Sequence, residues 1–218
     1  EYFGNPLIDA IHNSRKNFKG EKTFRKENNL DERRIVALLA GSRKQEIKYC
    51  LPEMIQAIEG NEKNYQFVIA GAPSLDPEVY KPFLKNNLKM VYDQTYELLS
   101  VSHAAIVTSG TATLETALFH VPQVVLYKTN PVNFHLGKLI VKYTYFSLVN
   151  LIAGKEVVKE LLQYNLHKNI KFELKRLLGD DNYRKKMLLE YQKVSDKIGE
   201  PGVSERVAAK MTEKLNII

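Results

Sequence analysis

Apolar runs of strand length alternate with amphipathic stretches of helix length from residue 34 onward. The apolar runs lie at residues 34–41, 65–71, 88–92, 103–110 and 121–129. The stretch after the first run places apolar residues at helical spacing, namely Ile47, Leu51, Met54, Ile55 and Ile58. Further helices are predicted at 76–86, 95–102, 111–120 and 132–142. The pattern therefore predicts five successive strand–helix steps.

The predicted strands are apolar at nearly every position rather than at alternate positions. Runs such as IVALLA, FVIA, AAIV and VVLY are typical of strands that are buried on both faces. Strands that alternate with helices imply right-handed crossovers and a parallel sheet. The sequence therefore predicts an α/β fold with a doubly wound, Rossmann-like parallel sheet.

Beyond residue 155 the pattern predicts helices alone, at 157–163, 168–179, 181–198 and 204–218. We accordingly expect three parts. Residues 1–30 form a linker from a preceding domain, residues 31–165 form the Rossmann-like domain, and residues 166–218 form a C-terminal helical extension. This extension packs on one of three bodies: the domain itself, the preceding half of the protein, or a partner subunit.

Composition narrows the class of protein. Of 218 residues, 44% are hydrophobic and 26% are charged, which is typical of an ordinary globular protein. The single cysteine, Cys50, excludes an internal disulfide framework, and its apolar helical surroundings place it in the core. No apolar run reaches the ~18 residues of a membrane span. The chain begins at Glu1, without an initiator methionine or a signal-peptide pattern, so we expect a piece of a longer protein.

The net charge of +7 raises the question of an anionic partner. The basic residues are spread along the chain and interleaved with acids, and the densest basic group, 13–29, lacks periodic apolar residues. We interpret that group as a solvated loop and expect no nucleic-acid partner. Weak contact with anionic lipid remains open.

Small and polar residues follow three of the predicted strands. They form the loops Ala-Gly-Ser-Arg at 40–43, Ala-Gly-Ala-Pro at 70–73 and Thr-Ser-Gly-Thr at 108–111. In open parallel sheets, ligands bind beyond the carboxyl ends of the strands. These three loops are therefore expected to converge on one edge and to form the site.

The third loop, with the helix that follows it, has the chemistry of an anion site. Gly110 permits a sharp turn and close approach of backbone, and Ser109 or Thr111 is suited to cap the helix. Free amides at a helix start favour an anion such as phosphate. Glu115, one turn on, accepts hydrogen bonds and suits the vicinal hydroxyls of a ribose. The alternative is an ordinary capped helix with an acid in its first turn.

The first loop offers a second anion-binding group. Arg43, after Ser42, is placed to bind a diphosphate through two hydrogen bonds, or it lies at the surface without a ligand. No Walker A or GxGxxG pattern is present, and the histidines lack metal-ligand spacing, so no cofactor or metal is expected. Among the histidines only His135, in a polar turn, is a candidate for function.

Five segments resemble one enzyme family and occur in that family's order. They are YFGNPLID (2–9), LLAGSRKQEI (38–47), TSGTATLETAL (108–118), VVLYKT (124–129) and SLVNLIAGKEVVKELLQ (147–163). Together they resemble the lipid-A-disaccharide synthases, and the resemblance covers nearly the whole chain from Tyr2 onward. Three positions where that family often has proline are Ala40, Val149 and Lys159 here, and Asn5 stands where it has histidine.

The resemblance implies an inverting glycosyltransferase of the two-Rossmann-domain type called GT-B. Such an enzyme transfers diacylglucosamine from UDP-2,3-diacylglucosamine to 2,3-diacylglucosamine 1-phosphate and releases UDP, in lipid A biosynthesis. This chain resembles the C-terminal half of such an enzyme, which binds the UDP-linked donor. The other half carries the lipid acceptor surface and the catalytic carboxylate, so no catalytic base is expected in this chain. The resemblance also implies a cytoplasmic location, peripheral contact with the inner membrane, and a homodimer that exchanges C-terminal helices.

Carried over residue by residue, the resemblance implies a donor site. Ser42 and Arg43 lie near the diphosphate, where Arg43 stabilises the leaving group, and Ser109, Gly110, Thr111 and Ala112 form the phosphate turn. Thr113 and Glu115 face the ribose, while Asn150, Glu160 and Gln163 face the donor sugar or phosphates. Two alternatives stay open: another UDP-N-acetylhexosamine transferase or epimerase of similar plan, or a basic interaction module without enzymatic activity.

Overall fold

The protein, seen in a computed structural model, contains a parallel sheet of the predicted type. The structure describes residues 2–85, 88–132, 134 and 144–215. Its strands are β1 (Arg34–Leu39), β2 (Tyr65–Gly71), β3 (Lys89–Tyr92), β4 (Ser102–Thr108), β5 (Gln123–Tyr127) and β6 (Lys159–Leu162). They pair in the order β3-β2-β1-β4-β5-β6, and all pairs are parallel. The doubly wound, Rossmann-like fold is confirmed.

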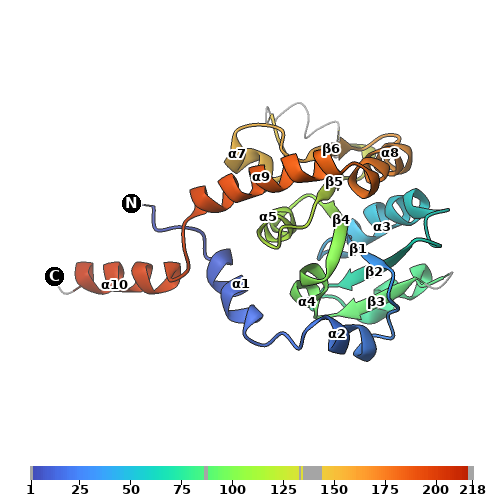
Figure 1. Ribbon diagram of the computed structural model, residues 1–218. Coiled ribbons are helices and arrows are strands. Elements are labelled where there is room, and N and C mark those ends of the chain that lie inside the picture. Colours follow the sequence, from blue (N-terminus) through green and yellow to red (C-terminus); the bar gives the residue numbers. More distant parts are fainter. Residues whose placement is uncertain (1, 86–87, 133, 135–143, 216–218) are drawn as a thin grey trace.

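Helices cover both faces of the sheet (Figure 1). The helices in the described ranges are α1 (Leu7–Arg15), α2 (Glu21–Glu27), α3 (Lys44–Ile58), the 3-10 helix η1 (Pro77–Phe83), α4 (Thr95–Ser100), α5 (Thr111–Leu118), α7 (Leu148–Ala153), α8 (Leu166–Gly179), α9 (Asp181–Ile198) and α10 (Val203–Leu215). Most of the helix predicted at 132–142, including His135, lies outside the described residues.

Alternate residues of the central strands enter two different apolar clusters. Val36 and Leu38 of β1 pack in the cluster that contains α3 and α8, whereas Ile35, Ala37 and Leu39 pack in the cluster that contains α2 and α4. All five are at most 4% exposed. Burial on both faces explains why the strand is continuously apolar. Cys50, on α3, is fully buried in the first cluster, as predicted.

The prediction that strands stop after residue 155 is wrong. Residues 159–162, within the segment predicted as helical, form β6, which pairs with β5 from Val124↔Lys159 to Tyr127↔Leu162. Lysine, glutamate and leucine favour helix locally, but backbone pairing with the open edge of β5 overrides that preference. The sheet therefore gains an edge strand that the sequence pattern does not reveal.

The interpretation of residues 13–29 as a solvated loop is also wrong. The end of α1 and the whole of α2 lie in this segment, and Phe24 and Arg25 are 4% and 7% exposed. Arg25 binds the carboxylate of Glu21 and the backbone oxygens of Asp31 and Arg33, so its charge is buried with partners. One buried aromatic and one satisfied arginine anchor a helix too short to show a periodic pattern.

The helix predicted at 76–86 is a shorter 3-10 helix, η1. It contains Pro77 at its start and Pro82 within it. Proline lacks the amide hydrogen that an α-helix interior requires. The tighter, shorter helix follows from these two residues.

The C-terminal helices differ in how they pack. α8 and α9 contribute Ile170, Leu174, Met187 and Tyr191 to the main apolar cluster. α8 packs on β4, β5 and β6, and α9 packs on α5, α7 and α8. α10 buries only Val203 among its described residues, and it projects away from the body beside the N-terminal segment (Figure 1). Met211 and Leu215 on it are 62% and 70% exposed.

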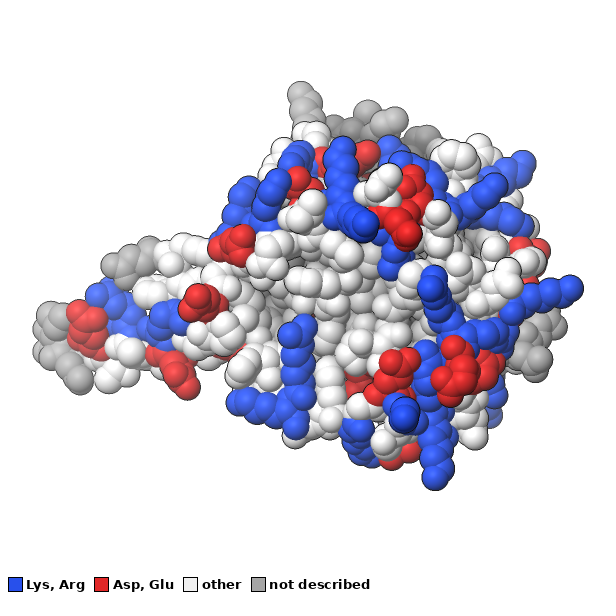
Figure 2. Space-filling model, viewed as in Figure 1, with Lys and Arg blue, Asp and Glu red and all other residues white. Residues whose placement is uncertain are grey.

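Basic and acidic side chains are interleaved over the face shown in Figure 2. Many form pairs, such as Lys155 with Glu190 and Lys193 with the same glutamate. This distribution matches the mixing of charges along the sequence. Of the helices in the described ranges, none has the length and apolar character that crossing a membrane requires.

Candidate functional site

Three predicted loops share the carboxyl edge of the sheet. The strand order reverses between β1 and β4, so residues 40–43 and 109–111 flank the crevice where such sheets bind ligands. Ser74, after β2, donates from Oγ to the backbone oxygen of Ser42 at 3.2 Å. The predicted convergence of the loops is confirmed.

The loop after β1 contains an internal anion. Gly41 has φ +104°, a conformation that favours glycine. The Glu46 carboxylate accepts hydrogen bonds from the amides of Ser42 and Arg43 at 2.9 and 3.2 Å, and from Arg43 Nη1 at 3.2 Å. Glu46 therefore occupies the amides at the start of α3. The side chain of Arg43 is 82% exposed, and Glu46 is its only ion-pair partner among the residues that the structure describes.

The loop after β4 leaves its backbone amides open. No described residue accepts a hydrogen bond from the amide of Gly110, Thr111 or Ala112. A Cβ atom built on Gly110 would meet no atom within 4 Å, so there is space beside the turn. These amides stand at the start of α5, where the helix dipole adds partial positive charge. The turn is therefore able to bind an anion.

The expected side-chain cap of α5 is absent. Gly110 is the N-cap residue, and no side chain bonds to the amides of the first turn. Ser109 instead donates from Oγ to the backbone oxygen of Phe146 at 2.7 Å. Thr113 donates to the oxygen of Gly110 at 2.8 Å and accepts from the amide of Leu148 at 3.2 Å. These hydroxyls join the turn to α7 rather than capping α5.

Glu115, one helical turn beyond this loop, lines a pocket of about 440 Å³. The pocket also contains Pro73, Asp93, Gln94 and Tyr96, and residues 14, 17 and 18 from the N-terminal segment. Burial raises the pKa of Glu115, although a hydrogen bond from Thr111 opposes that shift. Burial and the nearby charge of Glu115 raise the pKa of Tyr96 to about 12. The pocket therefore offers a partly buried carboxylate that is able to accept hydrogen bonds.

Asn150 and Glu160 form a polar network behind the loop after β4. Glu160 accepts from the amides of Phe146 and Ser147, at 2.8 and 3.0 Å, and from Asn150 Nδ2 at 2.7 Å. Asn150 is fully buried. Its Oδ1 accepts from the amides of Val157 and Val158 at 2.7 and 3.0 Å, and Nδ2 also donates to Val158 O at 2.9 Å.

Gln163 holds the loop that follows β5. Its Oε1 accepts from the amide of Thr129 at 3.1 Å, and its Nε2 donates to the oxygen of the same residue at 2.9 Å. The side chain is 5% exposed. It extends the pairing of β5 with β6 past the ends of both strands.

The structure thus separates the predicted residues into two groups. The first group lines or flanks the crevice and contains Ser42, Arg43, Gly110, Thr111, Ala112 and Glu115. The second group forms internal hydrogen bonds through its side chains and contains Ser109, Thr113, Asn150, Glu160 and Gln163. Sequence reasoning missed Glu46 and the pocket residues Asp93 and Tyr96. Glu46 had a signal, because a glutamate three residues after an N-cap is the spacing of a capping box.

Metal ligation has no support in the part of the chain that the structure describes. Within those residues, no three His, Cys, Asp or Glu side chains gather closely enough to hold a metal ion. His103 and His120 both have lowered pKa values through burial, to about 4 for His103. The ring of His103 lies against Arg184, and the Arg184 guanidinium donates a hydrogen bond to the backbone oxygen of His103 at 3.0 Å. These contacts indicate a structural role for His103.

The family model and the most similar curated proteins identify the same family. Residues 1–212 match the family described as lipid-A-disaccharide synthetase. The lipid-A-disaccharide synthase of Syntrophus aciditrophicus is 33% identical over 215 residues, which are 95% of this chain and 55% of that protein. The Coxiella burnetii enzyme of the same name is 37% identical over 192 residues, 86% of this chain and 50% of that protein. The chain spans about half the length of the curated relatives it matches.

Solved structures with similar folds include proteins of nucleotide-sugar chemistry. The UDP-GlcNAc 2-epimerase of Neisseria meningitidis, solved with UDP-GlcNAc, has a TM-score of 0.57 and 20% identity. The match covers 97% of this chain and 54% of the epimerase chain. A glycosyltransferase involved in lipopolysaccharide biosynthesis has a TM-score of 0.55 and 12% identity, over 86% of this chain and 49% of its own. These likenesses establish the fold as that of one Rossmann-like half of a GT-B glycosyltransferase.

Proposed function

This chain belongs to the lipid-A-disaccharide synthetase family, and we propose that it is the half of such an enzyme that binds the UDP-linked donor. The donor is UDP-2,3-diacylglucosamine, and the acceptor is 2,3-diacylglucosamine 1-phosphate. Transfer releases UDP and forms the disaccharide of lipid A. The acceptor and the catalytic base belong to the other half of the enzyme, so this chain alone binds the donor without turning it over.

The observation that carries the proposal is the open turn after β4. Three successive amides, at Gly110, Thr111 and Ala112, have no acceptor among the described residues, and the space beside Gly110 is empty of protein atoms. Oriented amides at a helix start bind phosphate without a charged side chain. We place a phosphate of the UDP diphosphate at this turn.

Arg43 supplies positive charge across the crevice. Its exposed guanidinium is held only by Glu46, at 3.2 Å, so it is free to turn toward a bound diphosphate. Charge accumulates on the diphosphate as the glycosidic bond breaks. Arg43, with the neighbouring Ser42, therefore stabilises the leaving group more strongly in the transition state than in the ground state.

Glu115 is the proposed ribose ligand. It lies one turn from the phosphate turn and lines the 440 Å³ pocket, whose remaining walls include Tyr96 and Pro73. A carboxylate accepts hydrogen bonds from both hydroxyls of a ribose. The phosphate turn and this pocket together match the two ends of a nucleoside diphosphate.

The internally bonded residues support the site from behind. Ser109 and Thr113 join the phosphate turn to α7, while Asn150 and Glu160 fix the start of α7. Gln163 holds Thr129 in the loop after β5. We propose that Asn150, Glu160 and Gln163 shape the donor-sugar end of the site chiefly by holding backbone in place.

The location and assembly proposed for the whole enzyme follow from its substrates and from α10. Both lipid substrates are membrane components, so we propose a cytoplasmic enzyme in peripheral contact with the inner membrane. The exposed Met211 and Leu215 of α10 suit packing on another body, and exchange of this helix between two subunits is the proposed arrangement.

Calorimetric titration of the folded chain with UDP tests the proposal. We expect saturable binding of one UDP per chain, with uridine and inorganic phosphate each binding far more weakly. A folded domain that ignored millimolar UDP would contradict the donor-binding function. Thermal unfolding with and without UDP gives an independent check, because a ligand that binds only the native state raises Tm.

A second function is consistent with the fold. The UDP-GlcNAc 2-epimerases resemble this chain in structure at 17–20% identity, which carries the fold alone. Assay of the full-length protein with UDP-2,3-diacylglucosamine and its acceptor, beside UDP-GlcNAc alone, separates transfer from epimerisation. A basic interaction module would instead bind anionic vesicles or nucleic acid in a salt-dependent manner and ignore UDP.

A further inference from the structure

A second cavity lies at the opposite edge of the sheet from the nucleotide loops. It has a volume of about 680 Å³, within the range of small-molecule pockets. Arg33, Tyr65 and Leu88 on its walls stand at the starts of β1, β2 and β3, and therefore at the amino edge. It shares no lining residue with the pocket beside Glu115. The two cavities are separate sites.

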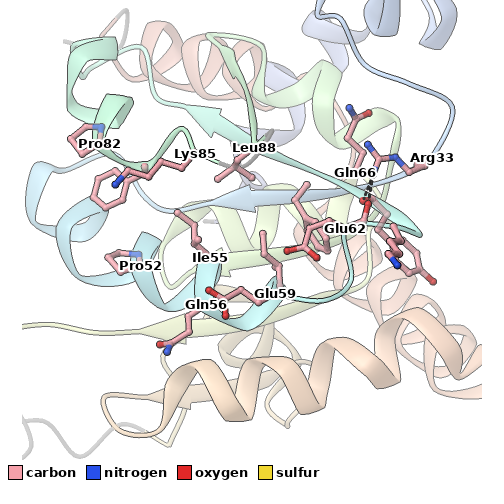
Figure 3. A pocket seen from close by; sticks show the side chains of 15 residues that line it. Arg33, Pro52, Ile55, Gln56, Glu59, Glu62, Gln66, Pro82, Lys85 and Leu88 are labelled. Atoms are coloured by element: carbon pink, nitrogen blue, oxygen red, sulfur yellow. Dashed lines mark hydrogen bonds between the residues drawn. The ribbon is translucent and has the colours of Figure 1, made fainter.

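The floor of this amino-edge pocket is apolar. Ile55 of α3 lies across the pocket from Leu88, with Pro82 toward one end and Arg33 at the other (Figure 3). Pro52, Ile58, Phe67 and Phe83 also line the pocket. Ile55, Phe83 and Leu88 are only partly buried, so a hydrocarbon group placed here would remove their exposed surface from water.

The rim carries cations that lack protein partners. Neither Lys63 nor Lys85 forms an ion pair or a side-chain hydrogen bond with any residue in the described ranges. The guanidinium of Arg33 already has partners, because it binds the carboxylate of Asp31 and the backbone oxygens of Glu62 and Tyr65. Arg33 therefore stabilises the wall of the pocket and is not available to a ligand.

Two carboxylates share the rim. Glu62 accepts a hydrogen bond from the amide of Gly60 at 2.7 Å, which uses part of its acceptor capacity. Glu59 is the other acid on the lining. Lys85 lies toward the Pro82 end of the pocket, away from Glu62 and Arg33, so its ammonium group remains available to an acidic head group (Figure 3).

We propose that this pocket binds the hydrocarbon chain of an anionic single-chain amphiphile, with its acidic head against Lys85. The apolar floor selects the chain, and the ammonium group of Lys85 selects the charge of the head. A fatty acid and a lipid phosphate monoester both have this chemistry. The inference is independent of the nucleotide function, because it uses none of the residues at the carboxyl edge.

Titration of the whole chain with alkyl carboxylates and alkyl phosphates of 10, 12 and 14 carbons, below their micelle concentrations, tests the proposal. We expect one site per chain, and roughly tenfold tighter binding for each added pair of methylenes. Stronger binding in one series identifies the head group as carboxylate or phosphate. Affinity that did not depend on chain length would overturn the proposal.

Variants locate the binding. Ile55→Glu places a carboxylate in the apolar floor and should weaken dodecyl phosphate at least tenfold, and the milder Ile55→Ala should reduce the gain per methylene pair. Lys85→Gln should weaken binding several-fold, most clearly at low salt, whereas Lys63→Gln, next to Glu62, should change it little. Lys185→Gln, an exposed lysine on α9, is the matched control.

Circular dichroism and UDP titration of each variant complete the design. If folded Ile55→Glu binds dodecyl phosphate like the parent chain, the amphiphile lies elsewhere and the assignment fails. Conversely, a Glu115→Ala chain that loses UDP while it keeps dodecyl phosphate shows that the sites are independent. Failure of the UDP proposal and failure of this one are thus read from different ligands.

Discussion

The carboxylate of Asp9, in the first helix, lies at the start of the last helix and binds Ser204. It accepts hydrogen bonds from the amide and the hydroxyl of Ser204, each at 2.8 Å, and from the amides of Gly202 and Val203 at 2.6 and 3.3 Å. Asp9 therefore caps α10 from a distant part of the chain. The bond from the amide of Asn5 to the oxygen of Ile198, at 3.1 Å, joins the same two segments.

Replacing Asp9 with asparagine should free the base of α10. The variant keeps one acceptor but loses the charge that favours a helix N-terminus. We expect faster hydrogen exchange at the amides of residues 202–206 with little change in exchange of the sheet. Glu205→Gln, in the same turn but outside the contact, is the control. Unchanged exchange in the Asp9 variant would show that α10 is held by other contacts.

The same contact has a defined pH dependence. Hydrogen bonds from Ser204 are the largest cause of a pKa of about 2 for Asp9, below its ordinary 3.8. A carboxyl group whose folded pKa is lowered contributes stability above the unfolded pKa and loses it as the pH falls through the folded one. Protection of residues 202–206 should therefore persist to about pH 4 and decline between pH 4 and 2. Loss of protection already at pH 6 would be contrary to this contact.

Glu115→Ala should weaken UDP at least tenfold without unfolding the domain. The sharper measurement is a comparison with 2′-deoxy-UDP. If the carboxylate binds the ribose hydroxyls, the parent chain prefers UDP and the variant binds both ligands alike. Because burial raises the pKa of Glu115, this preference should also fade at a higher pH than an ordinary glutamate would give. A preference that survived in Glu115→Ala would place the ribose elsewhere.

Gly41→Ala and Gly60→Ala form a matched pair. Both glycines have positive φ, +104° and +88°, so both alanines incur the backbone cost of about 1 kcal/mol. Only at position 41 does the new Cβ collide with Glu46, whereas it meets no atom at position 60. Urea unfolding should show a larger loss for Gly41→Ala, roughly 2–3 kcal/mol, together with weaker UDP binding. Equal losses would mean that Glu46 moves aside without cost.

Asn150→Ala should be destabilising even without a ligand. The change leaves the buried amides of Val157 and Val158 without their acceptor, which costs about 2–4 kcal/mol of unfolding free energy. Urea unfolding of the free chain measures the loss directly. Leu151→Ala, an exposed neighbour on α7, should change stability little. A stable Asn150→Ala chain that bound the donor poorly would instead support direct contact with the sugar.

The sequence was sufficient for the parts of the fold that repeat a pattern. The buried strands and the amphipathic α3 carry strong local signals, and parallel strands place their carboxyl ends together, so the converging loops followed. β6 could not be predicted from the sequence, because Lys159 and Glu160 prefer helix locally and form a strand only through pairing with β5. Arg25 is a similar case: its burial depends on carbonyl groups from residues 31 and 33.

The site was predictable in outline but not in its use of side chains. The family resemblance implied that Ser109 and Thr113 face a ligand, but hydroxyls serve equally well in caps, in ligand contacts and in tertiary hydrogen bonds. Which use applies depends on the position of α7, far along the chain. Asn150 and Glu160 illustrate the same limit, because their partners are backbone groups whose placement no local pattern encodes.

The order of the strands also governs how this chain folds. The central pair of the sheet joins Leu38 of β1 to Ile106 of β4, so a long loop must close before these two central strands meet. Folding should accordingly be slow beside that of a helical domain of equal size. Until β4 has been synthesised, the edge of β1 stays unpaired and apolar on both faces. Chains cut short before residue 102 should therefore aggregate during synthesis, even though β1 and β2 are already complete.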